Sequence, residues 1–191
     1  MNIRPAFSTD ADALAYLTNL SSEGMSGCIW EHLAEGEETP LQAGARLIAK
    51  DSGIFSFHNT TVIAQGHQVL GLISGRHLQG TNLPVRLDDF LPFIRPLIQL
   101  ETKVQETWNI TALAVDESMR HRGLAMQLLE AIEQKAQTMR LRQLSIAVAS
   151  ENTEACSLCQ GFGFQLIAEE EFIRFGSLIH NGKWLMMVKD I

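Results

Sequence analysis

The apolar positions of this chain follow two kinds of spacing. Residues 108–115 and 143–149 are almost continuously apolar, which indicates strands, and the second has the character of a strand buried on both faces. Between them, apolar residues recur every three or four positions and predict a helix to about Arg140, with one face formed by Leu124, Leu128, Ile132, Ala136 and Met139. A strand–helix–strand unit of this kind normally forms a right-handed parallel crossover.

Shorter elements are predicted on both sides of this unit. Further strands are expected at residues 2–7, 53–65, 69–77, 164–170 and 183–189. The turn composition of Gln65-Gly-His67 predicts a hairpin between two of them. Helices are expected from a cap at Thr9 or Asp10 to about Leu20, from Pro40 to Lys50, and from Asn152 or Thr153 to about Gly161. Residues 21–37 are rich in Gly, Ser and Glu, and are interpreted as a loop or a broken helix.

Composition narrows the class of protein. A chain of 191 residues with 46% apolar and 19% charged residues is expected to form one globular domain. The formal net charge of -7 argues against a nucleic-acid-binding protein, which would usually be basic. No apolar run approaches the ~18 residues of a membrane span, and Asp10 and Asp12 interrupt the segment where a signal peptide would be apolar. Three cysteines do not suggest a disulfide framework, so we expect a cytoplasmic protein with no membrane partner.

The junction between the strand at 108–115 and the following helix has the features of a phosphate-binding turn. Gly123 stands at the helix entrance, where a missing side chain lets a ligand approach the backbone. The free N–H groups of a first helical turn bind anions, and three neighbouring side chains can add donors, namely Arg120, His121 and Arg122. No Lys-Ser or Lys-Thr follows Gly123, and no Gly-x-Gly-x-x-Gly follows a strand, so neither a P-loop nor a dinucleotide fold is indicated.

Two motifs resemble those of the GNAT superfamily of acyl-CoA N-acyltransferases. Arg120-x-x-Gly123-x-Ala125 matches the Arg/Gln-x-x-Gly-x-Gly/Ala pattern of that family. A second block resembles the family's Asn-x-x-Ala-x-x-Leu-Tyr-x-x-x-Gly-Phe and reads Asn152-x-x-Ala155-x-x-Leu158-Cys159-x-x-x-Gly163-Phe164. The opening Ile3-Arg-Pro-Ala6 is also similar to a family N-terminus, so the resemblance covers most of the chain.

The resemblance implies an α/β fold with a mixed, mostly antiparallel twisted sheet of about seven strands and helices on both faces. Its central parallel pair would splay apart to admit acyl-CoA. Residues 1–191 would then form a single domain, with an inserted, partly helical excursion at about 79–107 that contains Pro84, Pro92 and Pro96. This excursion is interpreted as a substrate-side wall, a dimer surface, or a segment packed on its own domain.

The resemblance also implies acetyl-CoA as co-substrate and no metal. By this resemblance the strand backbone at Leu113, Ala114 and Val115 would hold pantetheine, with small Ala112 and Ala114 leaving room for it. The pyrophosphate would be bound at the turn by Arg120, His121, Arg122, Gly123, Leu124 and Ala125. Asn152 falls on a family position that contacts the cofactor arm, and it is equally well placed to cap a helix.

The implied reaction is direct attack of a primary amine on the acetyl thioester in a ternary complex. A general base must take the amine proton, and the family often places a Glu early on the central strand. Here that strand offers Asn109 and Thr111, neither of them a base, so Glu101 or Glu106 just upstream is favoured. More remote candidates are His77, Asp88 and Asp89.

Cys159 stands where the family usually has a tyrosine that protonates the departing thiolate. A thiol could supply that proton, but a buried cysteine more often packs as a small hydrophobic residue. With Cys156 it forms a C-x-x-C, although no second pair completes a zinc site. The missing tyrosine leaves a second hypothesis, a non-catalytic acyl-CoA-binding sensor or regulatory module. The acceptor, an amine-bearing small molecule or peptide, is not encoded in any motif, and a homodimer is a family-level expectation.

Overall fold

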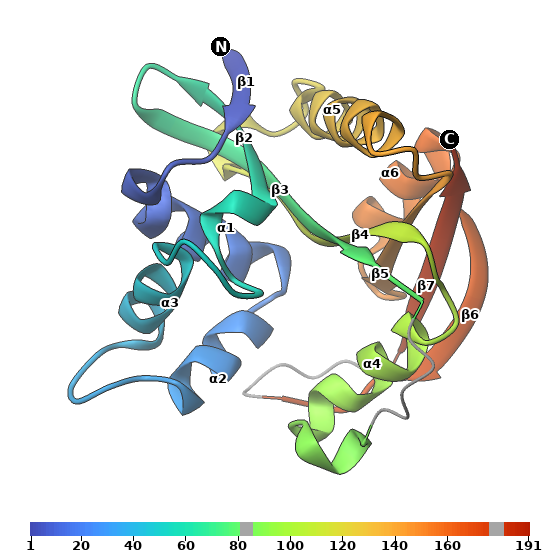
Figure 1. Cartoon of the computed structure of the whole chain (residues 1–191), viewed down its shortest axis with the longest axis horizontal. Coiled ribbons are helices and arrows are strands. Elements are labelled where there is room, and N and C mark those ends of the chain that lie inside the picture. The colour runs from blue at the N-terminus through green and yellow to red at the C-terminus, as the bar shows by residue number, and fades with distance from the viewer. Residues whose placement is uncertain (81–85, 176–181) are drawn as a thin grey trace. The chain divides into compact units, whose positions relative to one another are not determined.

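The chain forms an α/β fold around one mixed sheet (Figure 1). The structure is a computed structural model that describes residues 1–80, 86–175 and 182–191. Within these residues the sheet has 7 strands in the order β1-β2-β3-β4-β5-β7-β6. They are β1 Asn2–Pro5, β2 Thr60–Gln65, β3 Gln68–Leu78, β4 Thr107–Val115, β5 Gln143–Ala149, β6 Gln165–Glu171 and β7 Lys183–Asp190. The β4–β5 pair is parallel, whereas β1–β2, β2–β3, β5–β7 and β6–β7 are antiparallel, which confirms the predicted fold class.

The helices lie close to their predicted positions. They are α1 Ala11–Ser21, α2 Met25–His32, α3 Pro40–Ile48, α4 Arg95–Glu101, α5 Leu124–Thr138 and α6 Thr153–Phe162. Pro40 begins α3 as predicted, and a capping box fixes that start because Thr39 and Gln42 exchange side-chain-to-backbone hydrogen bonds. α2 shows that residues 21–37 form a broken helix, the second of the two alternatives. No helix in the described part of the chain is long and apolar enough to cross a membrane.

The chain divides into two compact units, each made of two segments. The first unit comprises Met1–Gly75 and Thr111–Ile132, and the second comprises Arg76–Ile110 and Glu133–Ile191. β3, β4 and α5 therefore contribute residues to both units.

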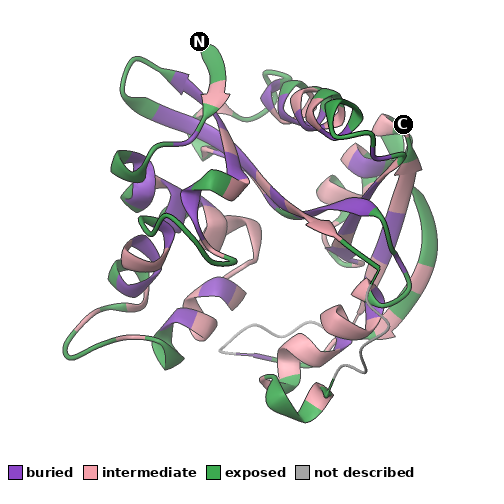
Figure 2. Cartoon of the chain, viewed as in Figure 1, coloured by how far each residue is buried: buried purple, intermediate pink, exposed green. Residues whose placement is uncertain are grey.

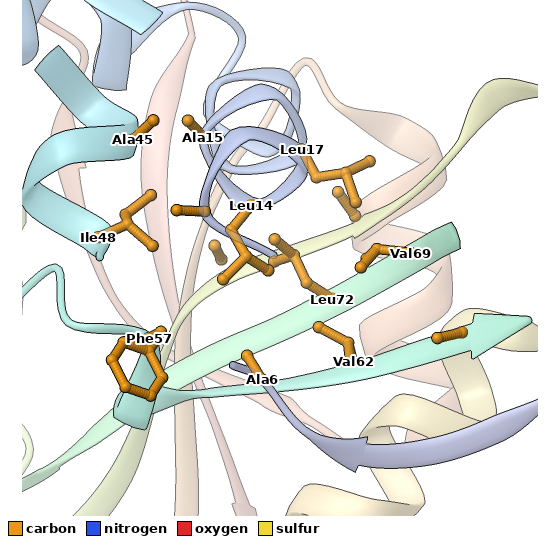
Figure 3. Close-up of a cluster of buried hydrophobic side chains, with 14 of the residues drawn as sticks. Ala6, Leu14, Ala15, Leu17, Ala45, Ile48, Phe57, Val62, Val69 and Leu72 are labelled. Atoms are coloured by element: carbon orange, nitrogen blue, oxygen red, sulfur yellow. The ribbon is translucent and has the colours of Figure 1, made fainter. Parts of the chain in front are cut away.

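The first unit has a core in which helices cover β2 and β3 (Figure 3). Leu14 and Leu17 of α1 pack with Val62 of β2 and Leu72 of β3, and Ile48 of α3 closes the cluster. Ala112 and Ala114 of β4 belong to the same cluster. Their side chains are therefore part of a packed core, which accounts for their small size without a ligand.

In the second unit, the predicted excursion contains α4 and the 3-10 helices η3 (Leu87–Asp89) and η4 (Pro92–Ile94). Residues 81–85 of it, including Pro84, lie outside the described residues. α4 packs against β6 and β7, and the Phe93 and Phe175 rings lie 5.4 Å apart, so the excursion packs on its own unit. β6 is exposed along most of its length, whereas β7 consists mainly of buried and half-buried residues (Figure 2).

The strand predicted at residues 53–65 is shorter than expected, because β2 begins only at Thr60. The preceding residues form a turn and the 3-10 helix η2 (Phe57–Asn59). Asn59 donates its side-chain amide to the carbonyls of Gly53 and Ile54, and the Ser56 hydroxyl accepts from the His58 N–H. Such local bonds compete with a strand ladder, and here they prevail over the β-forming composition.

An ion pair joins β1 to the start of α1. Arg4 donates two hydrogen bonds to Asp10, of 2.7 and 3.0 Å, and the Phe7 N–H donates a third at 2.8 Å. The Arg4 guanidinium lowers the pKa of the Asp10 carboxyl, burial opposes this shift, and the Phe7 N–H adds to it. Asp10 is thus a local anchor rather than the side-chain cap of α1 that the sequence suggested.

Asp10→Asn is expected to lower the free energy of unfolding at neutral pH by about 1.5–3 kcal/mol, the usual worth of hydrogen bonds to a charged group. Because folding lowers the pKa of Asp10, this contribution is complete above the unfolded pKa of ~3.9 and is lost as the pH falls through the folded value. Urea unfolding across pH should therefore show the difference from wild type shrinking below about pH 4. Asp12→Asn, an exposed change in the first turn of the same helix, is the control. A difference that stays constant into strong acid would contradict this account.

Candidate functional site

In the first unit, β4 leads through a short polar segment into α5. The 3-10 helix η5 (Glu117–Met119) follows the strand, and Asp116 caps it by accepting from the Ser118 amide at 3.0 Å and the Ser118 hydroxyl at 2.5 Å. These Ser118 donors are the main cause of a lowered pKa at the Asp116 carboxyl. The Asp116 N–H also donates to the Leu70 carbonyl at 2.8 Å, which ties the segment to β3.

The turn before α5 is exposed and has the backbone shape of a helix entrance. Arg120, His121, Arg122 and Gly123 are all exposed. His121 and Gly123 have left-handed φ values of 58° and 74°, and the Gly123 carbonyl accepts from the Gln127 N–H to start the helix. Glycine is favoured at position 123 because its backbone is left-handed. A Cβ placed there would meet nothing within 4 Å, so the space above the turn is open. A helix leaves its first N–H groups without intrahelical partners, and at the start of α5 the space beside Gly123 is open.

The two arginines of this turn differ in their contacts. Arg120 is 3.7 Å from Glu117, an exposed pair that contributes little to stability. Arg122 makes no ion pair with any residue in the described ranges. Both arginines directly precede α5 in the sequence, so their positive charge adds to that of the helix dipole near the start of the helix.

The strand backbone predicted to hold pantetheine lies just before this turn. The β4–β5 ladder pairs Trp108, Asn109 and Ile110 with Leu144, Ser145 and Ile146, and β4 then continues to Val115. Leu113 is half-buried and Ala114 is buried in the first unit. The structure therefore brings Leu113 to Val115 and Arg120 to Ala125 into one unit as a continuous strand–turn–helix segment.

Asn152 and Cys159 belong to the second unit, Asn152 directly before α6 and Cys159 within it. The Asn152 side chain accepts from the Ala155 N–H at 3.0 Å, which confirms its predicted role as N-cap. Cys159 is only 1% exposed, and burial, with a smaller effect of Cys156, raises the pKa of its thiol to about 12. Cys156 and Cys159 are both free thiols, and no group of three potential ligands for a metal ion occurs in the parts of the chain that the structure describes.

Glu101, at the end of α4, is held by two donors. Arg76 of β3 donates to its Oε2 at 2.6 Å, and the Asn109 side-chain amide donates to its Oε1 at 2.9 Å. The Glu101 side chain remains 20% exposed. Sequence reasoning named Glu101 but missed Arg76 and the role of Asn109; an amide inside an otherwise apolar strand was the signal that could have found it.

Glu106 has a different environment, at the turn before β4. Its side chain is 67% exposed and accepts from the Gly80 N–H at 2.9 Å, while His77 lies 3.3 Å away. The Gly80 N–H is the main cause of a lowered pKa at Glu106, and the residue itself has a left-handed φ of 53°. Its contacts are those of a loop anchor. The more remote candidates Asp88 and Asp89 lie in η3. Asp88 is 3.5 Å from Arg95, and among the described residues neither aspartate is hydrogen-bonded to Glu101.

Comparison with known proteins gives one family. A family profile described as the acetyltransferase (GNAT) family matches residues 29–164. No curated protein gives a significant sequence match.

Solved structures of similar fold extend over the whole chain. A ribosomal-protein-alanine N-acetyltransferase from Brucella melitensis has a TM-score of 0.64 and 19% identity, with 100% of each chain covered. An N-acetyltransferase from Staphylococcus aureus Mu50 has a TM-score of 0.66 and 15% identity, with 99% of this chain and 100% of that chain covered. YncA from Salmonella typhimurium, solved with its cofactor acetyl-CoA, has a TM-score of 0.61 and 15% identity, with 100% and 93% covered. At these identities the likeness concerns the fold.

Proposed function

We propose, from the premise that the chain belongs to the GNAT acetyltransferase family, that it transfers acetyl from acetyl-CoA to a primary amine by direct attack in a ternary complex. The observation that carries this proposal is the exposed turn at the N-terminus of α5. The family's Arg-x-x-Gly-x-Ala pattern falls on this turn, with open space above Gly123. Acetyl-CoA is the co-substrate typical of the family, and its pyrophosphate is the anion for which such a turn is suited.

The cofactor contacts are assigned to the strand–turn–helix segment. We assign the pyrophosphate to the amides from His121 to Ala125, with charge from Arg120 and Arg122. The pantetheine arm is assigned to the β4 backbone from Leu113 to Val115, beyond the last residue paired with β5. The Ala114 side chain lies in the core, so only its backbone is available to a ligand. Asn152 is proposed as a further contact to the cofactor arm, compatible with its capping role because one amide has donors and an acceptor.

The acceptor must lose a proton before it attacks. An alkylammonium has a pKa of ~10.4, so deprotonation at neutral pH costs about 4.6 kcal/mol. We assign the base role to Glu101 rather than Glu106. Glu101 is half-buried beside β4 and its side chain retains 20% exposure, whereas Glu106 is 67% exposed and bound to the Gly80 N–H.

The leaving thiolate does not take its proton from Cys159 in this proposal. A thiol of pKa about 12 would have to protonate a thiolate whose conjugate acid has a pKa of ~8.5, an uphill transfer of roughly 5 kcal/mol. Cys159 is therefore assigned a packing role, and the thiolate leaves as the carbon–sulfur bond breaks and is protonated from water.

The remaining expectations concern partners and location. The acceptor class stays a small molecule or peptide with a primary amine, and the net charge of -7 favours a cationic one. Three free cysteines fit a reducing, cytoplasmic setting. We also propose that the chain forms a single domain, that it assembles as a homodimer and that it uses no metal.

The proposed activity predicts that coenzyme A thiol is released only when a suitable amine is present. A panel of primary amines and peptides, each mixed with the protein and acetyl-CoA, should show thiol release with at least one acceptor and an acetylated product by mass spectrometry. Binding of acetyl-CoA with no transfer to any amine would instead favour the non-catalytic acyl-CoA-binding module.

Gly123→Leu is expected to weaken acetyl-CoA binding at least tenfold, because a side chain would fill the space that the ligand needs. Gly66→Leu is the matched control, since Gly66 also has a left-handed φ, of 60°, and a Cβ placed there would meet nothing within 4 Å, but it lies in the β2–β3 turn. Both changes carry the same kind of backbone strain. Calorimetric titration showing equal affinity in the two folded variants would remove the turn from the cofactor site.

Glu101→Gln is expected to lower turnover by 10²–10⁴-fold, the range of general base catalysis, with little change in acetyl-CoA affinity. It should also flatten the acidic limb of the pH–rate profile. Glu106→Gln, in which the amide oxygen can still accept from Gly80, should keep turnover within about threefold of wild type. The reverse result would transfer the base role to Glu106, and wild-type rates in both variants would place the base elsewhere.

A further inference from the structure

A chain of buried polar side chains ends on Glu101. Thr107 and Asn109 of β4 and Ser145 of β5 are 0%, 4% and 0% exposed. The Thr107 and Ser145 hydroxyls lie 2.8 Å apart, Ser145 Oγ is 3.1 Å from Asn109 Oδ1, and Asn109 Nδ2 is 2.9 Å from Glu101 Oε1. All of these residues lie within the second unit.

The donors and acceptors of these four side chains allow only one direction of hydrogen bonding. A carboxylate only accepts, so Asn109 must turn its NH2 group toward Glu101. Its carbonyl oxygen then faces Ser145, whose single hydroxyl proton must be donated to it. Ser145 can therefore only accept from Thr107, which becomes the donor of that pair. Each of the three hydrogen bonds is therefore donated in the direction of Glu101.

This fixed direction constrains the Glu101 side chain. If the Asn109 amide were turned over, its oxygen would face the carboxylate oxygen, and two acceptors would meet without a proton between them. The Arg76 guanidinium holds the other carboxylate oxygen at 2.6 Å. The carboxylate is thus clamped from two sides, while the Glu101 side chain as a whole remains 20% exposed.

We propose that Thr107, Ser145 and Asn109 are positioning residues that hold Glu101 in the orientation needed to accept the proton of the acceptor amine. The proposal rests on the proposed function, in which Glu101 is the base. Misplacement of a reacting group by about 1 Å can cost on the order of 10²-fold in rate, so removing a supporting bond is expected to act on turnover more than on binding.

The first unit contains a matched control. Thr60 and Ser74 form the same kind of hydroxyl pair, 2.7 Å apart, between β2 and β3, and no carboxylate from the described residues takes part in it. Ser145→Ala and Ser74→Ala therefore remove the same group from a strand-to-strand hydroxyl pair, with Ser145 buried and Ser74 half-buried. A structural role alone would lower the melting temperature in both variants and leave turnover unchanged in both.

The test measures turnover and the KM for each substrate in these variants, with an acceptor from the amine panel. Ser145→Ala is expected to lower kcat roughly tenfold, the effect of weakening one hydrogen bond to a charged group. The KM for acetyl-CoA should stay within about twofold, and Ser74→Ala should keep the wild-type kcat. A second pair of variants changes Thr107. Thr107→Val is isosteric but lacks the hydroxyl, and it is expected to lower kcat. Thr107→Ser retains the hydroxyl and is expected to keep the wild-type kcat. Unchanged kcat in folded Ser145→Ala or Thr107→Val overturns the proposal.

A double-mutant cycle separates this proposal from the base assignment on which it rests. If Ser145 acts through Glu101, Ser145→Ala should cause no further loss of kcat in a Glu101→Gln background. Additive losses overturn the positioning role and leave Glu101 as base. Wild-type kcat in Glu101→Gln refutes the base assignment, and the positioning role with it. Independently of activity, hydrogen exchange of the Asn109 side-chain amide should accelerate at least tenfold in Ser145→Ala, and unchanged exchange contradicts the chain.

Discussion

Most buried polar groups in proteins are hydrogen-bonded, and three buried polar side chains meet this preference where β4 runs parallel to β5. Thr107 and Asn109 of β4 and Ser145 of β5 lie there among mostly apolar neighbours, and hydrogen bonds join Thr107 to Ser145 and Ser145 to Asn109. Loss of one member would leave a buried donor or acceptor unsatisfied at a cost of about 1–3 kcal/mol. The three residues therefore behave as one group, and the acceptor at its end is the carboxylate of Glu101. The same hydrogen bonds therefore join β4 to β5 and orient the Glu101 carboxylate.

In the turn before α5, by contrast, polar backbone groups are exposed to solvent and have no partner within the helix. Its amides lack intrahelical partners because every helix leaves its first N–H groups unused, and exposure to solvent makes this tolerable. The segment from Arg120 to Gly123 is exposed throughout, while Leu124, Leu128 and Leu129 behind it are buried. A rigid, well-packed helix thus presents unpaired donors at an open surface, which is what recognition of an anion requires.

Local patterns predicted most of the fold, whereas long-range polar contacts escaped them. Periodicity placed β4, α5 and β5 to within a few residues, and the Arg120-to-Ala125 motif indicated the family that the profile match shows. The start of β2 was missed because Asn59 and Ser56 bond to nearby backbone. The partnership of Asn109 with Ser145 joins residues far apart in the sequence, and no spacing rule reveals such a pair. The environment of Glu101 depends on this pair, so the sequence alone left Glu101 and Glu106 as alternative candidates for the general base.

The division of the chain has a consequence for biosynthesis. Neither compact unit is a continuous length of polypeptide, since the first is completed only by residues 111–132. The core beneath α1 and α3 includes Ala112 and Ala114, which leave the ribosome after the first segment of the second unit. At about 5–20 residues per second, residues 76–132 take roughly 3–11 s to synthesise. For that interval the nascent chain carries an unfinished apolar core, so the rate of translation and access to chaperones become part of how this enzyme reaches its native state.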